Sequence, residues 1–305
     1  MRNLTVVLKL SKLCNLRCGY CYEFADLGNK ARMPLEGLAH AFPMLRDVAD
    51  RLDADIKFCW HGGEPLLLGR DYIDAAMSHQ RRTFPGGVNS VIQTNLFKVG
   101  TRELDVLRMF DHVSVSFDPF SDEREDAAGR SSRTRVADNM GFLRENNIRF
   151  GAISVLSAES IVHVERTFEF FNAARLSFRA LPYYREADAT RTARYGVPMR
   201  RIRDAMVRLV DLWFERSTGI EIFPIADYVS IAALHLTRRG RAYRYEKAKR
   251  EHVFVVDTDG AIYTSGTAYD RRYVYGNAFR RYCTNASWPP RRRDAAFRSK
   301  RSTRG

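Results

Sequence analysis

The sequence predicts an α/β protein: a partial (β/α)6 barrel of the TIM type with a small C-terminal α+β extension. Two observations lead to this fold class. Six short apolar, β-branched runs alternate with stretches of helical periodicity, which is the pattern of parallel βαβ units. Polar motifs follow the first four runs, and the functional groups of such barrels lie where strands end and βα loops begin.

The strands of the predicted barrel are runs in which Val, Ile, Leu and Phe are frequent. They are expected at residues 4–10, 55–60, 88–94, 112–117, 148–155 and 175–181. The intervening helices have apolar residues at spacings of three and four, at residues 35–52, 72–82, 103–110, 133–146 and 161–174. Pro43 lies inside the first helix and is expected to shift its start or to kink it.

The alternation of strands and helices stops after residue 181. We expect two further helices, at residues 202–214 and 227–236. A β-hairpin follows, with an Asp-Gly turn between strands at residues 253–256 and 261–263. The protein is therefore expected to form a partial barrel, a C-terminal region and a basic disordered tail, at residues 1–182, 183–282 and 283–305.

Composition narrows the class of protein. With 305 residues, 45% of them hydrophobic, the protein is able to bury a substantial core. The net charge of +14 favours an acidic peptide, an acidic redox protein or nucleic acid as a partner, but nucleic acid is not favoured because no nucleic-acid motif is present. The absence of a signal peptide and of a run of about 18 apolar residues predicts a cytoplasmic protein without membrane contact.

Three of the five cysteines lie at positions 14, 18 and 21, directly after the first predicted strand. This grouping is unlike a disulfide framework and favours a metal site in a reducing compartment. Zinc takes four ligands in structural sites, and an iron–sulfur cubane takes one ligand per iron, also four. Three thiolates therefore leave one position open, whichever metal binds.

The CxxxCxxC spacing of Cys14, Cys18 and Cys21, with Tyr20 before the third cysteine and Gly62-Gly63-Glu64-Pro65 after the second strand, resembles radical S-adenosylmethionine (SAM) enzymes. The resemblance implies one [4Fe–4S] cluster held by the three thiolates, with SAM chelating the fourth iron through its amino and carboxylate groups. It further implies that one electron from the cluster cleaves SAM to a 5′-deoxyadenosyl radical, which abstracts hydrogen from the substrate.

The same resemblance implies a set of cofactor-binding residues: Tyr20, Gly62, Gly63, Glu64, Ser116 and Arg124. The two glycines are expected to let the backbone approach the methionyl group, and Glu64 to pair with its ammonium. Ser116 is expected to face the ribose, and Arg124 to pair with the SAM carboxylate. Gln93 and Asn95 are weaker candidates, for which hydrogen bonding within their own loop is an equally good interpretation.

The motifs look most like those of the SPASM-type maturases, which include anaerobic sulfatase-maturating enzymes and ribosomal-peptide cyclases. This similarity covers most of residues 1–282. The sequence departs from that branch where auxiliary-cluster cysteines are expected, because Thr264 and Ser265 stand there instead. Only Cys59, expected in the core, and Cys283 remain outside the N-terminal loop, so we expect one cluster.

Asp227 lies where sulfatase maturases carry an aspartate that acts as a base on the substrate. The alternative for Asp227 is an ordinary helix N-cap. Tyr183, Tyr184 and Arg185 line the substrate pocket or belong to a surface loop. His61 and His112 are expected to be structural.

These expectations favour a radical SAM enzyme, of oxidoreductase type, that modifies a ribosomally synthesised peptide by a crosslink or by another C–H functionalisation of a side group. A flavodoxin- or ferredoxin-type protein is the expected reductant. The alternative is a radical SAM enzyme for a small metabolite such as a sugar or an antibiotic intermediate, which the missing auxiliary cysteines favour. A third hypothesis is a non-catalytic peptide-binding relative or a zinc protein.

Overall fold

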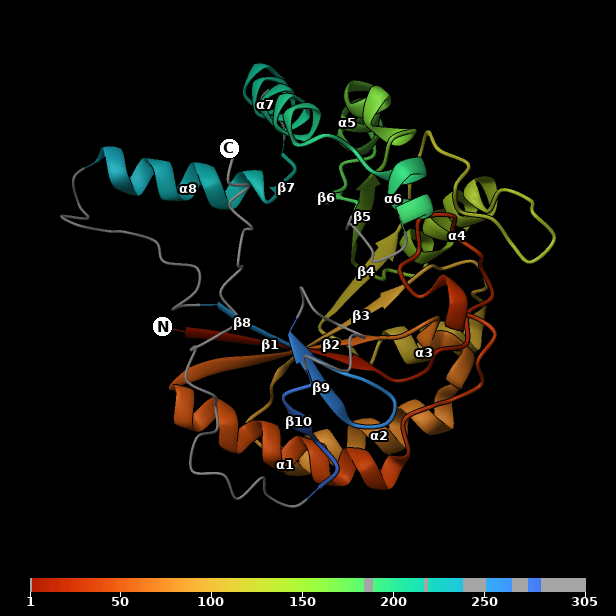
Figure 1. The fold of residues 1–305 in the computed structure, drawn as a ribbon, viewed down its shortest axis with the longest axis vertical. Coiled ribbons are helices and arrows are strands. Elements are labelled where there is room, and N and C mark those ends of the chain that lie inside the picture. The colour runs from red at the N-terminus through yellow and green to blue at the C-terminus, as the bar shows by residue number, and fades with distance from the viewer. Residues whose placement is uncertain (1, 184–188, 217–218, 238–250, 265–273, 281–305) are drawn as a thin grey trace, which may run out of the picture.

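The computed structural model describes residues 2–183, 189–216, 219–237, 251–264 and 274–280. One ten-stranded sheet runs through these residues in the order β10-β9-β8-β1-β2-β3-β4-β5-β6-β7. The sheet curves without closing, because β10 and β7 form its two edges (Figure 1). The predicted partial barrel is therefore confirmed.

The first six strands are parallel neighbours in sequence order. They are β1 (Arg2–Lys9), β2 (Ala54–His61), β3 (Asn89–Thr94), β4 (His112–Ser116), β5 (Phe150–Leu156) and β6 (Phe178–Pro182). The intervening helices lie along the outer side of the sheet (Figure 1). They are α1 (Leu35–Leu52), α2 (Arg70–Thr83), α3 (Thr101–Leu107), α4 (Arg133–Glu145) and α5 (Val164–Ala173). Three single 3-10 turns, Phe24–Asp26, Pro65–Leu68 and Ser160–His163, complete this part of the protein.

The core lies between the sheet and the helices. Alternate residues of a strand point to opposite faces, so Leu4, Val6 and Leu8 of β1 are all fully buried against the helices. On β2, Phe58 and Trp60 occupy the same layer, and the Phe58 ring centroid lies 5.2 Å from that of Phe42 on α1. The other residues of each strand, which alternate with the buried ones, face the inner side of the curved sheet. The polar residues of the βα loops lie at the carboxyl ends of these strands.

The C-terminal part extends the same sheet. It contains α6 (Ala189–Tyr195), α7 (Met199–Glu215), β7 (Ile222–Phe223), α8 (Ile225–Leu236), β8 (Glu251–Val256), β9 (Ala261–Thr264) and β10 (Gly276–Asn277). The predicted hairpin is confirmed as β8 and β9, with Gly260 at φ 82° in its turn. In addition, β8 pairs in parallel with β1, which the sequence did not indicate.

Several details differ from the prediction. The short elements α6, β7 and β10 were not expected, and the helix expected from residue 161 begins as a 3-10 turn. No helix within the described residues is both long and apolar enough to span a membrane. Tyr184, Arg185, Ser265, Cys283 and the basic tail lie outside the described residues.

Candidate functional site

The cysteine loop directly follows β1 and is tightly folded. Cys14 and Cys18 are each 9% exposed, Cys21 is half-buried, and all three are free thiols. The loop is closed by backbone hydrogen bonds from Cys14 N to Leu27 O, at 3.0 Å, and from Cys21 N to Cys18 O, at 3.0 Å. The structure therefore brings together the three cysteines that the sequence singled out.

The surroundings of the three thiols disfavour their charged form. Burial raises the pKa of Cys14 and of Cys21 to about 12 each, and it also raises the pKa of Cys18. The positive charge of Arg124 partly opposes this effect at Cys14 and Cys18, as that of Lys9 does at Cys21. Because a metal ligand must be a thiolate, this loop needs the charge of a bound metal group to ionise fully.

The donor set of the loop consists of three free thiols from one short segment. Within the part of the protein that the structure describes, no three His, Cys, Asp or Glu side chains converge on a point where a single metal ion could bind. In a cubane each thiolate binds a different iron, so its ligands need not converge in this way. Thiolates are the ligands that iron–sulfur clusters take, so the chemistry of this donor set is suited to such a cluster.

Asn95, which follows β3, contacts the cysteine loop directly. Its Nδ2 donates to Cys14 Sγ at 3.4 Å and to Asn15 Oδ1 at 2.8 Å, and Leu16 N also donates to Cys14 Sγ at 3.4 Å. Cys14 thus accepts two N–H···S hydrogen bonds, which stabilise negative charge on its sulfur. Asn95 Oδ1 also accepts a hydrogen bond from Phe97 N of its own loop at 2.9 Å, so its side chain joins the loop after β3 to the cysteine loop.

Gly62 and Gly63 lie where the backbone leaves β2, packed against the loop that leaves β1. A Cβ atom on Gly62 would lie 2.3 Å from Ser11 O, and one on Gly63 would lie 2.3 Å from Leu13 O. Gly63 N donates to Ser11 O at 2.7 Å, and Glu64 N donates to Leu13 O at 2.9 Å. The close backbone approach that these glycines permit is therefore to the protein's own cysteine loop.

Glu64 joins the ends of β2 and β3. Its side chain is fully enclosed, and Oε1 accepts hydrogen bonds from Leu66 N at 3.0 Å and from Thr94 Oγ1 at 2.8 Å. Oε2 accepts from Asn95 N at 2.7 Å. Burial raises the pKa of Glu64, and these donors oppose that rise. The carboxylate therefore holds the second and third βα loops together beside the cysteines.

Tyr20, Asp118 and Arg124 form a buried group across the loop. Arg124 Nη1 donates to the Tyr20 hydroxyl at 2.6 Å, the Tyr20 hydroxyl donates to Asp118, and Arg124 lies 3.8 Å from Asp118. Arg124 is 8% exposed, and its Nε is buried without a hydrogen-bond partner. Since a buried unpaired donor is costly, this atom is suited to an anionic ligand such as a carboxylate.

Ser116 ends β4 on the inner side of the sheet. Gln93 of β3 donates from Nε2 to Ser116 Oγ at 3.4 Å. The two residues thus lie together at the carboxyl ends of neighbouring parallel strands, which is where ligands of such sheets bind.

A second buried polar group was not singled out by the sequence. Lys9 is 1% exposed, and its Nζ lies 3.2 Å from Glu23 Oε2 and 3.1 Å from His61 Nδ1, with Tyr22 as a further partner. Burial of the His61 ring lowers its pKa well below the usual value, and the positive charge of Lys9 lowers it further. The available sequence signal was a lysine within the mostly apolar run predicted as the first strand, at residues 4–10.

The remaining predicted residues stand apart from the cysteine loop. Asp227 is exposed, and it is the third residue of α8, after Pro224 at the helix start. The N-cap interpretation is therefore wrong. His112 is exposed at the beginning of β4, while Tyr183 is buried after β6. Cys59 is half-buried rather than enclosed in the core.

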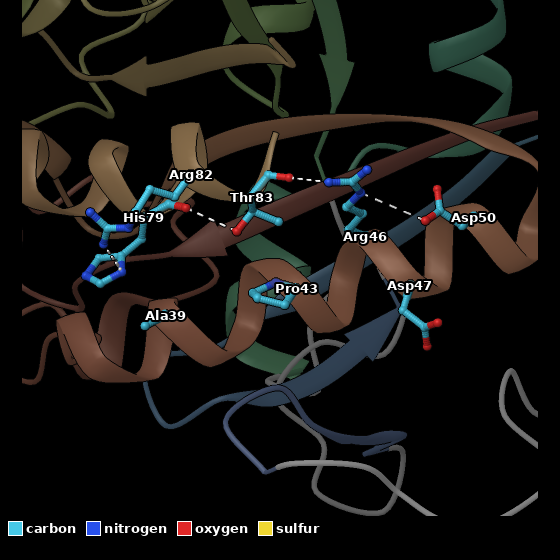
Figure 2. Close-up of a pocket in the computed structure, with 8 residues that line it drawn as sticks. All are labelled: Ala39, Pro43, Arg46, Asp47, Asp50, His79, Arg82 and Thr83. Carbon is cyan, nitrogen blue, oxygen red and sulfur yellow. Dashed lines mark hydrogen bonds and ion pairs between the residues drawn. The ribbon is translucent and has the colours of Figure 1, made fainter. Parts of the chain in front are cut away.

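A surface pocket between α1 and α2 lies away from these groups. Figure 2 shows its lining, and in it Arg46 donates to Thr83 O at 2.6 Å. The lining residues are Ala39, Pro43, Arg46, Asp47, Asp50, His79, Arg82 and Thr83. None of the candidate site residues is among them.

Comparison with known proteins gives concordant results. A family model described as the Radical SAM superfamily matches residues 8–171. The cysteine-type anaerobic sulfatase-maturating enzyme of Clostridium novyi (strain NT) is 22% identical over 282 residues, which cover 86% of this sequence and 73% of that protein. This sequence spans 44% of the length of a Synechocystis relative that is 25% identical to it, and 40% of the length of the serine-type anaerobic sulfatase-maturating enzyme of Klebsiella aerogenes.

Two solved structures share the fold. Native anSMEcpe with bound AdoMet aligns with a TM-score of 0.71 at 19% identity, covering 92% of this protein and 80% of that one. Streptococcus suis SuiB bound to S-adenosylmethionine aligns with a TM-score of 0.64 at 14% identity, covering 92% of this protein and 64% of that one. At these identities the likeness concerns the fold.

Proposed function

The protein belongs to the radical SAM superfamily, and from that membership we propose that it modifies a ribosomally synthesised peptide. The expected change is a crosslink or another C–H functionalisation of a side chain. Relatives with the same fold support a peptide substrate: one structure is anSMEcpe with the Cp18Cys peptide, and another is SuiB with the precursor peptide SuiA.

In this proposal, Cys14, Cys18 and Cys21 each hold one iron of a [4Fe–4S] cluster. The cluster and SAM together supply a 5′-deoxyadenosyl radical when they are bound. The protein's own contribution is to orient both groups against the substrate. Asn95 supports the Cys14 thiolate through its hydrogen bond to the sulfur.

The observation that carries the SAM-binding part of the proposal is the buried, unpartnered Nε of Arg124 beside the thiols. We assign it to the SAM carboxylate, with Tyr20 and Asp118 holding the guanidinium in place. The enclosed carboxylate of Glu64 supplies negative charge for the methionyl ammonium, next to the backbone of Gly62 and Gly63. Ser116 is assigned to the ribose.

Two further roles belong to the same proposal. Asp227, exposed in the first turn of α8, would accept the proton released if the substrate radical were oxidised by one electron, with the one cluster as the electron acceptor. A flavodoxin- or ferredoxin-type protein of acidic surface would supply the electron, and the net charge of +14 favours its approach.

Anaerobic reconstitution with iron and sulfide tests the cofactor assignment. We expect about four irons per protein molecule and release of 5′-deoxyadenosine from SAM under dithionite. Cys18→Ala should abolish SAM cleavage, whereas Cys59→Ala, at a free thiol outside the loop, should retain it. Cleavage that survives Cys18→Ala contradicts the proposal.

Mass spectrometry of reaction products tests the substrate class. Short peptides encoded beside the gene are incubated with the reconstituted enzyme, SAM and dithionite, and a crosslink appears as a loss of hydrogen mass. Asp227→Asn should lower product formation while leaving SAM binding unchanged. If sugars or antibiotic intermediates are modified and the peptides are not, the small-metabolite alternative replaces the peptide assignment.

A further inference from the structure

Helix α6 contacts the cysteine loop from outside the matched family segment. Arg191 Nη2 donates to Gly19 O at 2.5 Å and to Cys21 O at 2.7 Å. These two carbonyl groups flank Tyr20, within the Cys18–Cys21 half of the loop. Figure 1 shows α6 beside this red N-terminal loop, although about 170 residues separate Arg191 from it in the sequence.

Aromatic side chains complete the contact. The Arg191 guanidinium lies 4.7 Å from the Phe24 ring centroid and 5.7 Å from that of Tyr195. Tyr195 occupies the space beside Gly19, where a Cβ would lie 2.4 Å from its hydroxyl oxygen. Tyr195 is 6% exposed, and its carbonyl accepts from Ala158 N at 3.0 Å, so α6 is itself anchored to the residues after β5.

We propose that Arg191 is a positioning residue for the iron–sulfur cluster: it fixes the Cys18–Cys21 half of the loop, slows loss of the cluster and raises its reduction potential. This inference rests on the proposed function, because it assumes that the loop holds a [4Fe–4S] cluster. Arg191 acts through the loop backbone and has no assigned contact with SAM or substrate.

Two physical effects lead to this proposal. A guanidinium that bridges two carbonyl oxygens restrains both peptide groups, and outer-shell partners of this kind commonly change metal affinity 10- to 100-fold. Its positive charge lies on the backbone of the loop that would hold the cluster. Reduction of such a cluster by dithionite would add one electron and break no bond. A nearby cation stabilises the more negative, reduced form, so removing the charge makes reduction harder.

The test compares Arg191→Gln, Arg191→Lys and Arg194→Gln in the reconstituted protein. Arg194 is the matched control, because it lies on the same helix with its guanidinium 5.1 Å from the Tyr195 ring centroid. No hydrogen bond from Arg194 to the cysteine loop is found among the described residues. The readouts are iron release to a chelator, followed by absorbance, and the midpoint potential, followed by the EPR signal of the reduced cluster.

We expect Arg191→Gln to release iron about tenfold faster than the parent and to titrate at a more negative potential. Arg191→Lys keeps the positive charge but lacks the planar guanidinium that bridges the two carbonyl oxygens. The midpoint potential of this variant should therefore stay closer to that of the parent, while iron release is still accelerated. Arg194→Gln should match the parent in both measurements.

Equal potentials and equal iron release in Arg191→Gln and Arg194→Gln overturn the inference. If Arg191→Gln does not fold, unchanged iron release in Arg191→Lys overturns it equally. Failure of the parent protein to bind a cluster is a different result, because it contradicts the proposed function itself.

Discussion

At the scale of single residues, Gly63 packs directly against backbone. A Cβ atom added at this position would lie only 2.3 Å from the carbonyl oxygen of Leu13. This contact joins the loop after β1 to the loop after β2 through backbone atoms alone. A side chain at position 63 must therefore displace backbone, and the displaced backbone carries Cys14 one residue further on. The glycine motif is thus part of the cysteine site through packing.

Gly63→Ala is expected to destabilise the protein by about 1–3 kcal/mol, because a backbone clash cannot be relieved by a rotamer change. Gly141→Ala is the matched control: it lies within α4 with open space around its Cβ position, and alanine is the better helix former by about 1 kcal/mol. Urea unfolding of both variants tests the opposite signs. A neutral Gly63→Ala contradicts this account.

His61 and Lys9 give a prediction about pH. In the folded protein the pKa of His61 is well below its usual value of 6.5, through burial and the Lys9 charge. Below pH 6.5 the unfolded protein therefore binds a proton that the folded protein does not. Stability should fall as the pH drops, by up to about 1.4 kcal/mol per pH unit from this residue.

The comparison of the parent with His61→Gln isolates this contribution. Urea midpoints of both proteins are measured between pH 7.5 and pH 5.5, where other groups titrate equally in the two. The difference in stability between them should shrink, or reverse, on acidification. Parallel curves would mean that His61 has the same pKa in the folded and unfolded states, which contradicts the prediction.

At the scale of secondary structure, the elements that were predicted correctly are those in which the spacing of apolar residues repeats several times. The helix expected at residues 35–52 is α1 with the same bounds, and its buried residues follow the predicted spacing. The two-residue strands β7 and β10 have no period to detect, and the seven residues of α6 contain few apolar side chains. Arg191 therefore escaped prediction, because its importance comes from a contact distant in sequence.

Helix α8 allows a test on one element. Ile225 is 1% exposed and belongs to the core, whereas Leu236, at the other end of the helix, is 78% exposed. Ile225→Ala should cost about 2–5 kcal/mol, and Leu236→Ala should change stability by less than about 0.5 kcal/mol. Thermal or urea unfolding measures both. Equal losses would mean that α8 packs along its whole length.

At the scale of the whole molecule, β1 is a central strand that delivers the cysteines and has β2 on one side and β8 on the other. The two neighbours come from distant parts of the sequence. The site residues near the cysteines could be predicted because motifs mark the ends of successive strands. The support of β1 by β8 could not, since strand pairing at such separation leaves no local pattern.

Truncation tests this support. A variant ending at Thr237 lacks β8 and leaves one edge of β1 unpaired, so we expect aggregation and no cluster binding. A variant ending at Arg280 keeps every strand of the described sheet and should remain monodisperse and bind the cluster. Size-exclusion chromatography and iron content distinguish the two. A well-folded, iron-loaded variant ending at Thr237 contradicts the prediction.

The pairing of Asn3 with Glu251 has a consequence for how the protein is made. At about 5–20 residues per second, tens of seconds of translation separate the emergence of β1 from that of β8. The cysteines leave the ribosome early, yet the strand that precedes them gains its second neighbour only after β8 has emerged. Until β8 has paired, β1 lacks part of its final support, so we expect a stable metal site at the cysteine loop only after that interval.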